Sequence, residues 1–444
     1  MKIKQILLGL GFALVLCAFA NAQAANADSQ DGSTEGQSSS QFQVTTITAA
    51  DMPALRSMWE SSLKHVNDAI AINMQAVIDL QHKADLPNEV QFYGNAHSSL
   101  VYFGLDIQNN QNVYHLILNT PFTPELQSYL EGSDAQFDVM VCEDCLSEET
   151  LAQKVADLAQ AFGNVGLTNT MGTDVFIQGL EVQSFATEFN ASEAGGDVPE
   201  GLGISQQALD FLHELKQNGT FEGVPVGYSV DPDPDATVID VTARTDSTPI
   251  VSGGQPIGQD PEVTAYCTGG FIVTDNTIAG ISTAGHCDGQ AVAYEGHLYQ
   301  TSGYAPPSLG GVAWYGLNAR VVSKFQSNFG VYTTVTGQAA PKLGKLYCKF
   351  GAVTGETCST IYKANQCANA PYTGVWTCKL WSVYANVSEP GDSGGPWFDG
   401  SIAIGIHFGA SDVDHIVRSL FSDMSSLEAA GAHLLIGAFG TPAV

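Results

Sequence analysis

The stretch that decides the fold of this chain is Ser388-Glu389-Pro390-Gly391-Asp392-Ser393-Gly394-Gly395-Pro396. A serine between glycines on a tight turn lets the backbone N–H groups of Gly391 and Ser393 converge on one point, as stabilisation of an oxyanion in acyl transfer requires. A hydroxyl alone is a weak nucleophile and needs a base. His286, in Thr283-Ala284-Gly285-His286-Cys287, is a candidate base because its neighbour Cys287 can anchor it through a disulfide.

Composition argues against one large class of functions. The chain has 444 residues and a net charge of −30, from 46 acidic and 16 basic side chains. Such a surface repels phosphate backbones, so we expect no nucleic-acid partner. Residues 23–244 hold 32 acidic and 6 basic side chains, whereas residues 245–444 hold 14 and 8. This difference predicts a boundary between two units near residue 244.

The amino terminus has the pattern of an export signal. Lys2 and Lys4 precede an apolar run over residues 6–19, and small residues suited to signal peptidase follow. We expect residues 1–24 to be a signal peptide and residues 25–43 a flexible Ser- and Gln-rich segment. The protein is then secreted, to the periplasm or the medium, and no later apolar run is long enough for a membrane anchor.

Eight cysteines follow Cys17 of the signal segment, and an even number in an oxidising compartment favours disulfides. Pairing of neighbours is the simplest assignment. It joins Cys142 to Cys145, Cys267 to Cys287, Cys348 to Cys358 and Cys367 to Cys378. The motif from Cys142 to Cys145 could instead bind metal, but no second pair or histidine cluster accompanies it. We therefore expect no metal and no cofactor.

Residues 44–244 have the pattern of an α+β region. Apolar residues recur at three-to-four spacing over residues 51–84, which predicts one long helix or two. Alternating apolar residues before and after an Asn/Gln turn predict a strand pair over residues 101–119. Ser147 and Ser205 each precede a helical pattern and are predicted helix caps.

A second strand pair is predicted over residues 221–243, with its turn at residues 231–235. Because it resembles the pair at 101–119, the region could contain two related helix-plus-hairpin units. Beyond residue 245 the sequence is rich in Gly, Ser and Thr and predicts short strands. Helical periodicity appears there only over residues 420–435. That pattern predicts an all-β sandwich or barrel with one C-terminal helix.

The two motifs, in this order and 107 residues apart, resemble the trypsin/chymotrypsin-type serine peptidases. The resemblance is to their bacterial streptogrisin and α-lytic protease branch, and it covers about residues 250–440. It implies a double antiparallel β-barrel for residues 245–444. It also implies that Ser393 is the nucleophile, His286 the general acid and base, Gly391 and Ser393 the oxyanion-hole donors, and Asp392 the buried carboxylate that shapes the loop.

The family's third catalytic residue, an aspartate that orients the histidine, is missing. No aspartate lies between Asp288 and Asp392, and Gly311 stands where relatives carry it. Relatives also have a serine after the Ile-His pair that follows the nucleophile, and here that residue is Phe408. We interpret the double change as a rebuilt site, because a phenylalanine can fill the volume of a buried polar pair.

Three interpretations of the missing aspartate stay open. Another carboxylate could support His286, with Asp288, Glu295 and Asp412 as candidates. A bare serine–histidine pair could hydrolyse slowly, since loss of the aspartate costs about 10⁴-fold in rate in a chymotrypsin-type enzyme. The third possibility is a pseudopeptidase that binds peptides or a protein partner without cutting.

Three residues are predicted to contact substrate: Val387, His407 and Phe408. Val387 stands where trypsin-like relatives carry the aspartate of the primary pocket, so cleavage after Lys or Arg is not expected. Glutamate-cleaving relatives carry a histidine at the position of His407. Two interpretations of His407 therefore stay open: it receives an acidic substrate side chain, or it is a histidine of the core. The expected partner is a polypeptide substrate.

The resemblance extends, in position and in the Val230-Asp231-Pro232 ending, to the pro-regions of this branch. It implies that residues 44–244 assist folding and then inhibit the peptidase domain, residues 245–444. An accessory domain that stays attached is the alternative. Ile250-Val251-Ser252-Gly253-Gly254 resembles a mature amino terminus, and Asp392 is expected to pair with that terminus or with Arg320 or Arg418.

Overall fold

The computed structural model describes sixteen segments of the chain. They are residues 44–83, 98–108, 111–121, 123–132, 135–167, 170–185, 205–231, 251–258, 267–287, 292–294, 297–299, 301–317, 321–369, 375–414, 416–436 and 441–442. All of these lie in one compact unit, Phe42–Val444. The predicted signal peptide and the Ser- and Gln-rich segment lie outside the described residues.

The first half of the N-terminal region is a four-stranded sheet of order β1-β4-β3-β2 with two helices. Its elements are β1 (Val44–Thr46), η1 (Ala49–Asp51), α2 (Met52–Lys83), β2 (Leu100–Gln108), β3 (Gln111–Leu118), α4 (Pro124–Glu131) and β4 (Gln136–Val141). The strand pair predicted over residues 101–119 is β2 and β3, which run antiparallel. The predicted helix over 51–84 is α2, which kinks at Asn73 where φ is −157° and ψ 87°.

The second half of the region is built around strands in the order β5-β6-β8-β7. Its elements are α5 (Glu148–Asn164), β5 (Thr170–Asp174), β6 (Gly179–Phe185), α7 (Gln206–Asn218), β7 (Thr220–Phe221) and β8 (Val224–Asp231). Both predicted caps are confirmed: Ser147 Oγ accepts from the N–H of Thr150 at 3.2 Å, and Ser205 Oγ from that of Ala208 at 3.1 Å. Each hydroxyl satisfies a backbone donor that the first helical turn leaves unpaired.

The two halves repeat one motif, but not the one predicted. In each, an antiparallel hairpin is followed by a helix and then by a strand parallel to the second hairpin strand: β2-β3-α4-β4 and β5-β6-α7-β8. The hairpin that matches residues 101–119 is therefore β5-β6. The first strand of the pair predicted over 221–243 corresponds to β7 and β8, which turn at Glu222 and Gly223, both at positive φ. The rest of the predicted pair, residues 232–243, lies outside the described residues.

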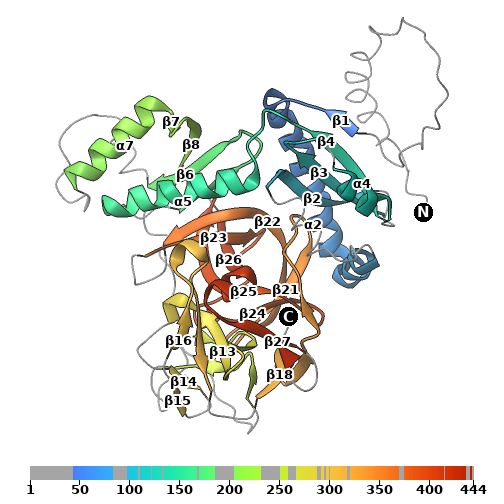
Figure 1. Ribbon diagram of the computed structural model, residues 1–444, viewed down its shortest axis with the longest axis vertical. Coiled ribbons are helices and arrows are strands. Elements are labelled where there is room, and N and C mark those ends of the chain that lie inside the picture. Colours follow the sequence, from blue (N-terminus) through green and yellow to red (C-terminus); the bar gives the residue numbers. More distant parts are fainter. Residues whose placement is uncertain are drawn as a thin grey trace, which may run out of the picture. The chain divides into compact units, whose positions relative to one another are not determined.

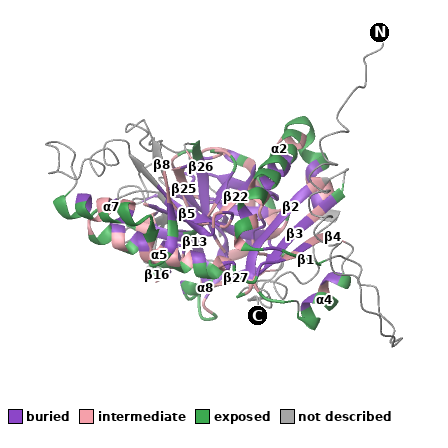
Figure 2. Ribbon diagram, turned by 90° about the horizontal axis from the view of Figure 1, so that it is seen from above, coloured by how far each residue is buried: buried purple, intermediate pink, exposed green. Residues whose placement is uncertain are grey.

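Six antiparallel strands of the C-terminal region form a closed circuit of neighbours. The order is β21-β24-β25-β26-β23-β22, and β21 pairs with β22 to close it. Their bounds are β21 (Leu346–Gly351), β22 (Gly355–Asn369), β23 (Trp376–Val383), β24 (Pro396–Asp399), β25 (Ile402–Val413) and β26 (Ile416–Asp423). Figure 2 shows β25 and β26 largely buried, whereas the outward faces of α2 and α7 are exposed.

The other strands of this region form a six-stranded sheet, β16-β17-β13-β12-β27-β28, and three smaller sheets. The six strands are β12 (Ile272–Thr274), β13 (Ala279–Ala284), β16 (Thr301–Tyr304), β17 (Val312–Gly316), β27 (His433–Ile436) and β28 (Thr441–Pro442). The smaller sheets hold β9 (Val251–Gly253), β10 (Pro256–Ile257), β11 (Cys267–Thr268), β14 (Val292–Tyr294), β15 (His297–Tyr299), β18 (Val321–Asn328) and β19 (Val331–Thr334), while β20 (Gly337–Gln338) pairs with β25. The region is thus β-rich, and the second barrel of the expected pair stays a prediction.

The C-terminal helix is much shorter than predicted. Residues 420–435 comprise the end of β26, the short helix α8 (Ser425–Ala429) and most of β27. Leu420, Leu427 and Leu434, spaced by seven, are all buried, so the pattern that suggested one helix serves a strand, a helix and a strand. Gly431, with φ of +76°, ends the helical stretch.

The N-terminal region and the C-terminal region share a sheet and a core. Strand β5 pairs with β22 at Met171 and Cys367, which extends the sheet of the C-terminal region into β6, β8 and β7. In Figure 1, α5 lies beside the β22–β23 hairpin. Cys367 and Cys378 of that hairpin pack in the same buried cluster as Leu151 and Phe162 of α5.

Candidate active site

Backbone hydrogen bonds hold the loop that carries Ser393 against strands β11 and β25. Thr268 N donates to Ser393 O at 2.7 Å, and Gly394 N donates to His407 O at 2.7 Å. Gly391 has φ of +99° and Gly394 φ of +91°, a conformation that strains any residue with a side chain. The glycines of the motif are therefore required by the turn that presents the serine.

Asp392 is buried beneath this turn and paired with Lys349. The carboxylate lies 2.8 Å from Lys349 Nζ, and both side chains are fully buried. The carboxylate also accepts from Thr354 Oγ1 at 2.7 Å and from the N–H groups of Glu389, Val353 and Thr354. Although burial opposes it, the lysine and these donors lower the pKa of Asp392. The loop shape is fixed by a charge pair inside the fold.

This partner differs from the predicted ones. Asp392 was expected to bind a new amino terminus, Arg320 or Arg418. Arg320 lies outside the described residues, and Arg418 donates instead to the carbonyls of Val413 and Tyr384. Lys349 was missed because a lysine in the short strand Leu346–Gly351 has no local signal for burial. Its one available signal was that the buried carboxylate implied by the resemblance needed a cation.

The backbone N–H groups of Gly391 and Ser393 donate to no acceptor within the described part of the chain. Asp392 N, which lies between them, donates to Glu389 O at 3.0 Å. Two donors on this turn, one of them the N–H of Ser393 itself, are therefore free to bind an oxygen of a ligand.

His286 lies on a short turn, η2 (Gly285–Cys287), directly after β13. Cys287 is bonded to Cys267, and Gly285 N donates to Gly311 O at 2.5 Å, so both neighbours of the histidine are fixed. Its Nδ1 is buried and has no hydrogen-bond partner among the residues that the structure describes. Burial lowers the pKa of His286 to about 4, because no anion offsets the cost of charging it.

Phe408 contacts both reactive residues. Its ring meets the His286 imidazole edge to face, with centroids 5.2 Å apart and planes at 82°. Its carbonyl oxygen accepts a hydrogen bond from Ser393 Oγ at 3.2 Å. Ser393 O lies 3.7 Å from Cys287 Sγ, which places the serine beside the turn that carries the histidine. The hydroxyl is thus turned to a backbone carbonyl rather than to the imidazole.

Gly311 lies next to His286 without supplying a side chain. It has φ of +56°, and its carbonyl, rather than a carboxylate, accepts from Gly285 N. A Cβ at Gly311 would lie 3.0 Å from Thr377 Cγ2 and 3.2 Å from Thr377 Oγ1. Thr377, a buried residue of β23, therefore fills the space beside Gly311. The contact between Thr377 and the space beside Gly311 could not be predicted from the sequence, because Thr377 comes from a distant strand.

The alternative carboxylates do not rescue the histidine within the described residues. Asp412 lies on β25, and Nδ1 of His286 has no hydrogen bond to it or to any other group there. Asp288 and Glu295 lie outside the described residues. In this part of the chain His286 has neither a carboxylate nor a hydroxyl partner.

Two of the predicted substrate-contact residues, Val387 and His407, have different neighbours. Val387 N donates to Ser419 Oγ at 3.0 Å, and Ser419 also hydrogen-bonds Ser388, so small polar groups lie beside it. His407 is 1% exposed, and its Nδ1 lies 3.3 Å from the indole nitrogen of Trp397. Burial lowers the pKa of His407 to about 3. This is the geometry of a neutral core histidine, which argues against a direct role in binding an acidic side chain.

All four predicted cysteine pairs lie at bonding distance. They are Cys142 with Cys145, Cys267 with Cys287, Cys348 with Cys358 and Cys367 with Cys378. Two of these pairs also have a nearby Asp144 or Glu356, a grouping that could suggest a metal ion. A disulfide leaves no thiolate to bind one, so neither grouping is a metal site.

A serine on a turn with two unsatisfied N–H donors, beside a histidine fixed on a second sheet, is the arrangement of a serine peptidase of the trypsin class. Comparison with known proteins agrees. The chain is 32% identical over 183 residues to streptogrisin-C of Streptomyces griseus and 29% identical over 166 residues to streptogrisin-A of the same organism. It is 28% identical over 157 residues to serine protease 1 of Streptomyces fradiae. Over the matched part, the chain is therefore similar to trypsin-like serine peptidases of the streptogrisin group.

These matches cover 40%, 37% and 33% of the chain and 39%, 53% and 42% of the three relatives. The chain thus spans about half or less of the length of the curated relatives it matches. Among solved structures, Thermobifida fusca protease A is 29% identical, with 42% of this chain and all of that chain covered at a TM-score of 0.37. Cellulomonas bogoriensis chymotrypsin is 26% identical, with coverages of 42% and 99% and a TM-score of 0.36. No protein-family model matches the chain.

None of the helices in the described segments combines the length and the apolar character needed to cross a membrane.

Proposed function

We propose that the chain is the precursor of a secreted serine endopeptidase in which Ser393 is the nucleophile and His286 the general base. The observation that carries the proposal is the oxyanion loop. A buried pair, Asp392 with Lys349, holds a turn on which the N–H groups of Gly391 and Ser393 are both unsatisfied. Such preorganised donors supply the largest single part of catalysis in acyl transfer, and a merely structural turn has no need to keep them unpaired.

In the proposed reaction a peptide carbonyl enters with its oxygen between these two N–H groups. Ser393 Oγ leaves the carbonyl of Phe408, passes its proton to His286 and attacks the peptide carbon. His286 then protonates the leaving amine, and water hydrolyses the acyl-enzyme by the reverse sequence. Because no carboxylate within the described residues partners His286, the step should be slower by about 10⁴-fold than in a complete triad.

The remaining roles follow the same proposal. Residues 1–24 direct export, residues 44–244 assist folding of the peptidase and then inhibit it, and residues 245–444 are the mature enzyme. Val387 and Phe408 border the site that receives the substrate side chain, whereas His407 supports it from the core. Polypeptides are the proposed substrates.

A second candidate is a pseudopeptidase that binds peptides without cutting them. It is favoured by the unpartnered Nδ1 of His286 and by the hydrogen bond that turns Ser393 toward Phe408. A fluorophosphonate probe separates the two. The peptidase should form an adduct on Ser393 that mass spectrometry locates in the wild type, weakly in His286→Ala and not in Ser393→Ala. No adduct in correctly processed, folded wild-type protein, at any pH from 4 to 9, would overturn the enzyme proposal.

A further inference from the structure

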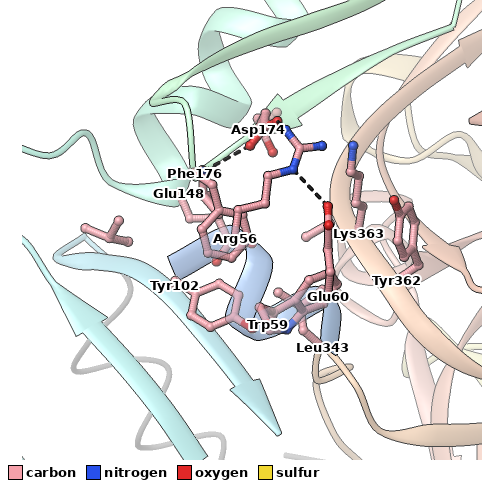
Figure 3. A pocket seen from close by; sticks show the side chains of 14 residues that line it. Arg56, Trp59, Glu60, Tyr102, Glu148, Asp174, Phe176, Leu343, Tyr362 and Lys363 are labelled. Carbon is pink, nitrogen blue, oxygen red and sulfur yellow. Dashed lines mark hydrogen bonds and ion pairs between the residues drawn. The ribbon is translucent and has the colours of Figure 1, made fainter. Parts of the chain in front are cut away.

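Charged side chains gather where the N-terminal region meets the β22–β23 hairpin of the peptidase region. Figure 3 shows part of this junction, with Arg56 between Asp174 and Glu60 and with Lys363 and Tyr362 on the neighbouring strand. The charged groups that face the junction from the N-terminal region are Arg56, Glu60, Glu148, Glu149, Asp157, Asp174 and Glu181. Those from the peptidase region are Lys363, Lys379, Asp414, Arg418 and Asp423, with Tyr362 beside them.

Three cations of the junction, Lys363, Arg56 and Arg418, already have close partners. Lys363 Nζ lies 2.6 Å from Glu181 Oε2 and 3.0 Å from Asp414 Oδ2. Arg56 binds Asp174 at 2.8 Å and Glu60 at 2.9 Å. The guanidinium of Arg418 stacks 3.9 Å above the ring of Tyr362. In the described segments, eight carboxylates thus face four cations, so docking brings together an excess of negative charge.

Glu148 has no cation partner among the described residues. It is the first residue of α5, and its Oε1 accepts a hydrogen bond from the neutral side chain of Asn365 at 3.2 Å. Asp423 adds a like charge nearby. Because docking takes this carboxylate out of water and gives it only a neutral donor, the protonated form is favoured in the docked state.

We propose that docking of residues 44–231 on the β22–β23 hairpin takes up a proton at Glu148, so that the two regions hold together in acid and separate as the pH rises. The proposal rests on the proposed function, in which the N-terminal region leaves the peptidase. Its readout is assembly rather than hydrolysis, so it can fail while the peptidase assignment stands.

The direction follows from linkage. Burial raises the pKa of Glu148 from 4.5 to about 7 in the docked state. Below pH 4.5 both states are protonated and docking is tightest. Between pH 4.5 and 7 only the docked state holds the proton, so the dissociation constant rises tenfold per pH unit. Above pH 7 it no longer changes through this group. From pH 5 to pH 8 the expected increase is about 100-fold.

The test uses the full chain with a site-specific protease sequence inserted after Asp235. The folded protein is cut there, and retention of the two pieces is followed by size-exclusion chromatography over a dilution series at pH 5 and pH 8. In the wild type the dissociation constant should rise about 100-fold at pH 8. Glu148→Gln, which copies the protonated form, should remain assembled at both pH values. Glu143→Gln, at an exposed glutamate five residues before the first residue of α5, should behave as the wild type.

Two results would overturn the proposal. One is an equal dissociation constant for the wild type at pH 5 and pH 8, and the other is the same pH dependence in Glu148→Gln. If Glu148→Gln fails to fold, proton uptake by the wild type decides. Pieces separated at pH 8 and mixed at pH 6 should take up about one proton per complex, measured with an indicator dye. Uptake of none would contradict the role given to Glu148.

Discussion

Phe408 packs the edge of its ring against the imidazole of His286, with the two centroids 5.2 Å apart. The same residue accepts a hydrogen bond from the Ser393 hydroxyl through its backbone carbonyl. One residue therefore supplies an apolar neighbour to His286 and a hydrogen-bond partner to Ser393. Within the described residues these contacts surround an imidazole whose Nδ1 has no hydrogen-bond partner.

Restoring an aspartate at Gly311 alone should not raise activity. Gly311 has φ of +56°, and a Cβ there would lie 3.0 Å from Thr377 Cγ2. Gly311→Asp should therefore lower the free energy of unfolding by about 1–3 kcal/mol, measured by denaturant titration. Phe408 would also leave the new carboxylate without a hydroxyl donor, which raises its pKa.

The combination of Gly311→Asp with Phe408→Ser and Thr377→Ala should do more than the sum of its parts, because Phe408 contacts His286, Gly311 contacts the neighbouring Gly285, and Thr377 fills the space at Gly311. The upper limit for the gain in kcat/KM is about 10⁴-fold. Wild-type hydrolysis that is already fast and is unaffected by these changes would mean that another residue supports His286. Asp288→Asn, Glu295→Gln and Asp412→Asn would then identify it.

The pH dependence of Ser393 labelling should have an unusual acid limb. Burial lowers the pKa of His286 to about 4, so the imidazole stays neutral, and able to accept a proton, down to that pH. The labelling rate should fall by half near pH 4. Phe408→Leu, which keeps an apolar neighbour, should leave this midpoint in place, whereas Phe408→Ser should raise it toward the ordinary value of about 6.5 by admitting water. A wild-type midpoint near 7 would reveal a carboxylate beside the histidine.

Removal of Lys349 should disable the oxyanion loop. Lys349→Met leaves Asp392 buried without its cation, which should cost about 3–5 kcal/mol of unfolding free energy and most of the labelling rate. Lys349→Met combined with Asp392→Asn should recover part of the stability but not the rate. Lys324→Met, at an exposed lysine of β18, is the matched control and should change neither. If Lys349→Met labels at the wild-type rate, the pair does not hold the loop.

The disulfide beside His286 should matter more than the one in the N-terminal region. The Cys267–Cys287 pair closes a separation of 20 residues and Cys142–Cys145 one of 3. Replacing Cys267 and Cys287 by alanine should lower the unfolding free energy by about 3 kcal/mol and slow labelling of Ser393, since the turn carrying the histidine loosens. Replacing Cys142 and Cys145 should leave labelling unchanged. Equal labelling in both double variants would show that the disulfide does not position the base.

Local features of the fold could be predicted from the sequence. Ser147 and Ser205 cap helices because the signal lies within four residues of each helix start. The cysteine pairs could be predicted because neighbouring cysteines on short strands lie close in space. The glycines at 391 and 394 follow from the turn itself, since both have positive φ.

Features that depend on distant strands could not be predicted. Lys349 pairs with Asp392 across 43 residues, and nothing in its strand distinguishes a buried lysine from an exposed one. Thr377 fills the space at Gly311 only because β23 passes beside it. The apolar spacing over 420–435 predicted one helix, but two strands use the same leucines. In each case tertiary packing, rather than local preference, decided the outcome.

Hydrolysis of peptides by purified protein tests the central claim most directly. A peptide library incubated with the wild type and with Ser393→Ala, each cut between the two regions, can be read by mass spectrometry for newly formed termini. The account predicts slow cleavage by the wild type, on the order of 10⁴-fold below a complete triad, and none by Ser393→Ala. Identical peptide profiles for the two proteins, in samples where the fold and disulfides are intact, would contradict it and leave a peptide-binding protein.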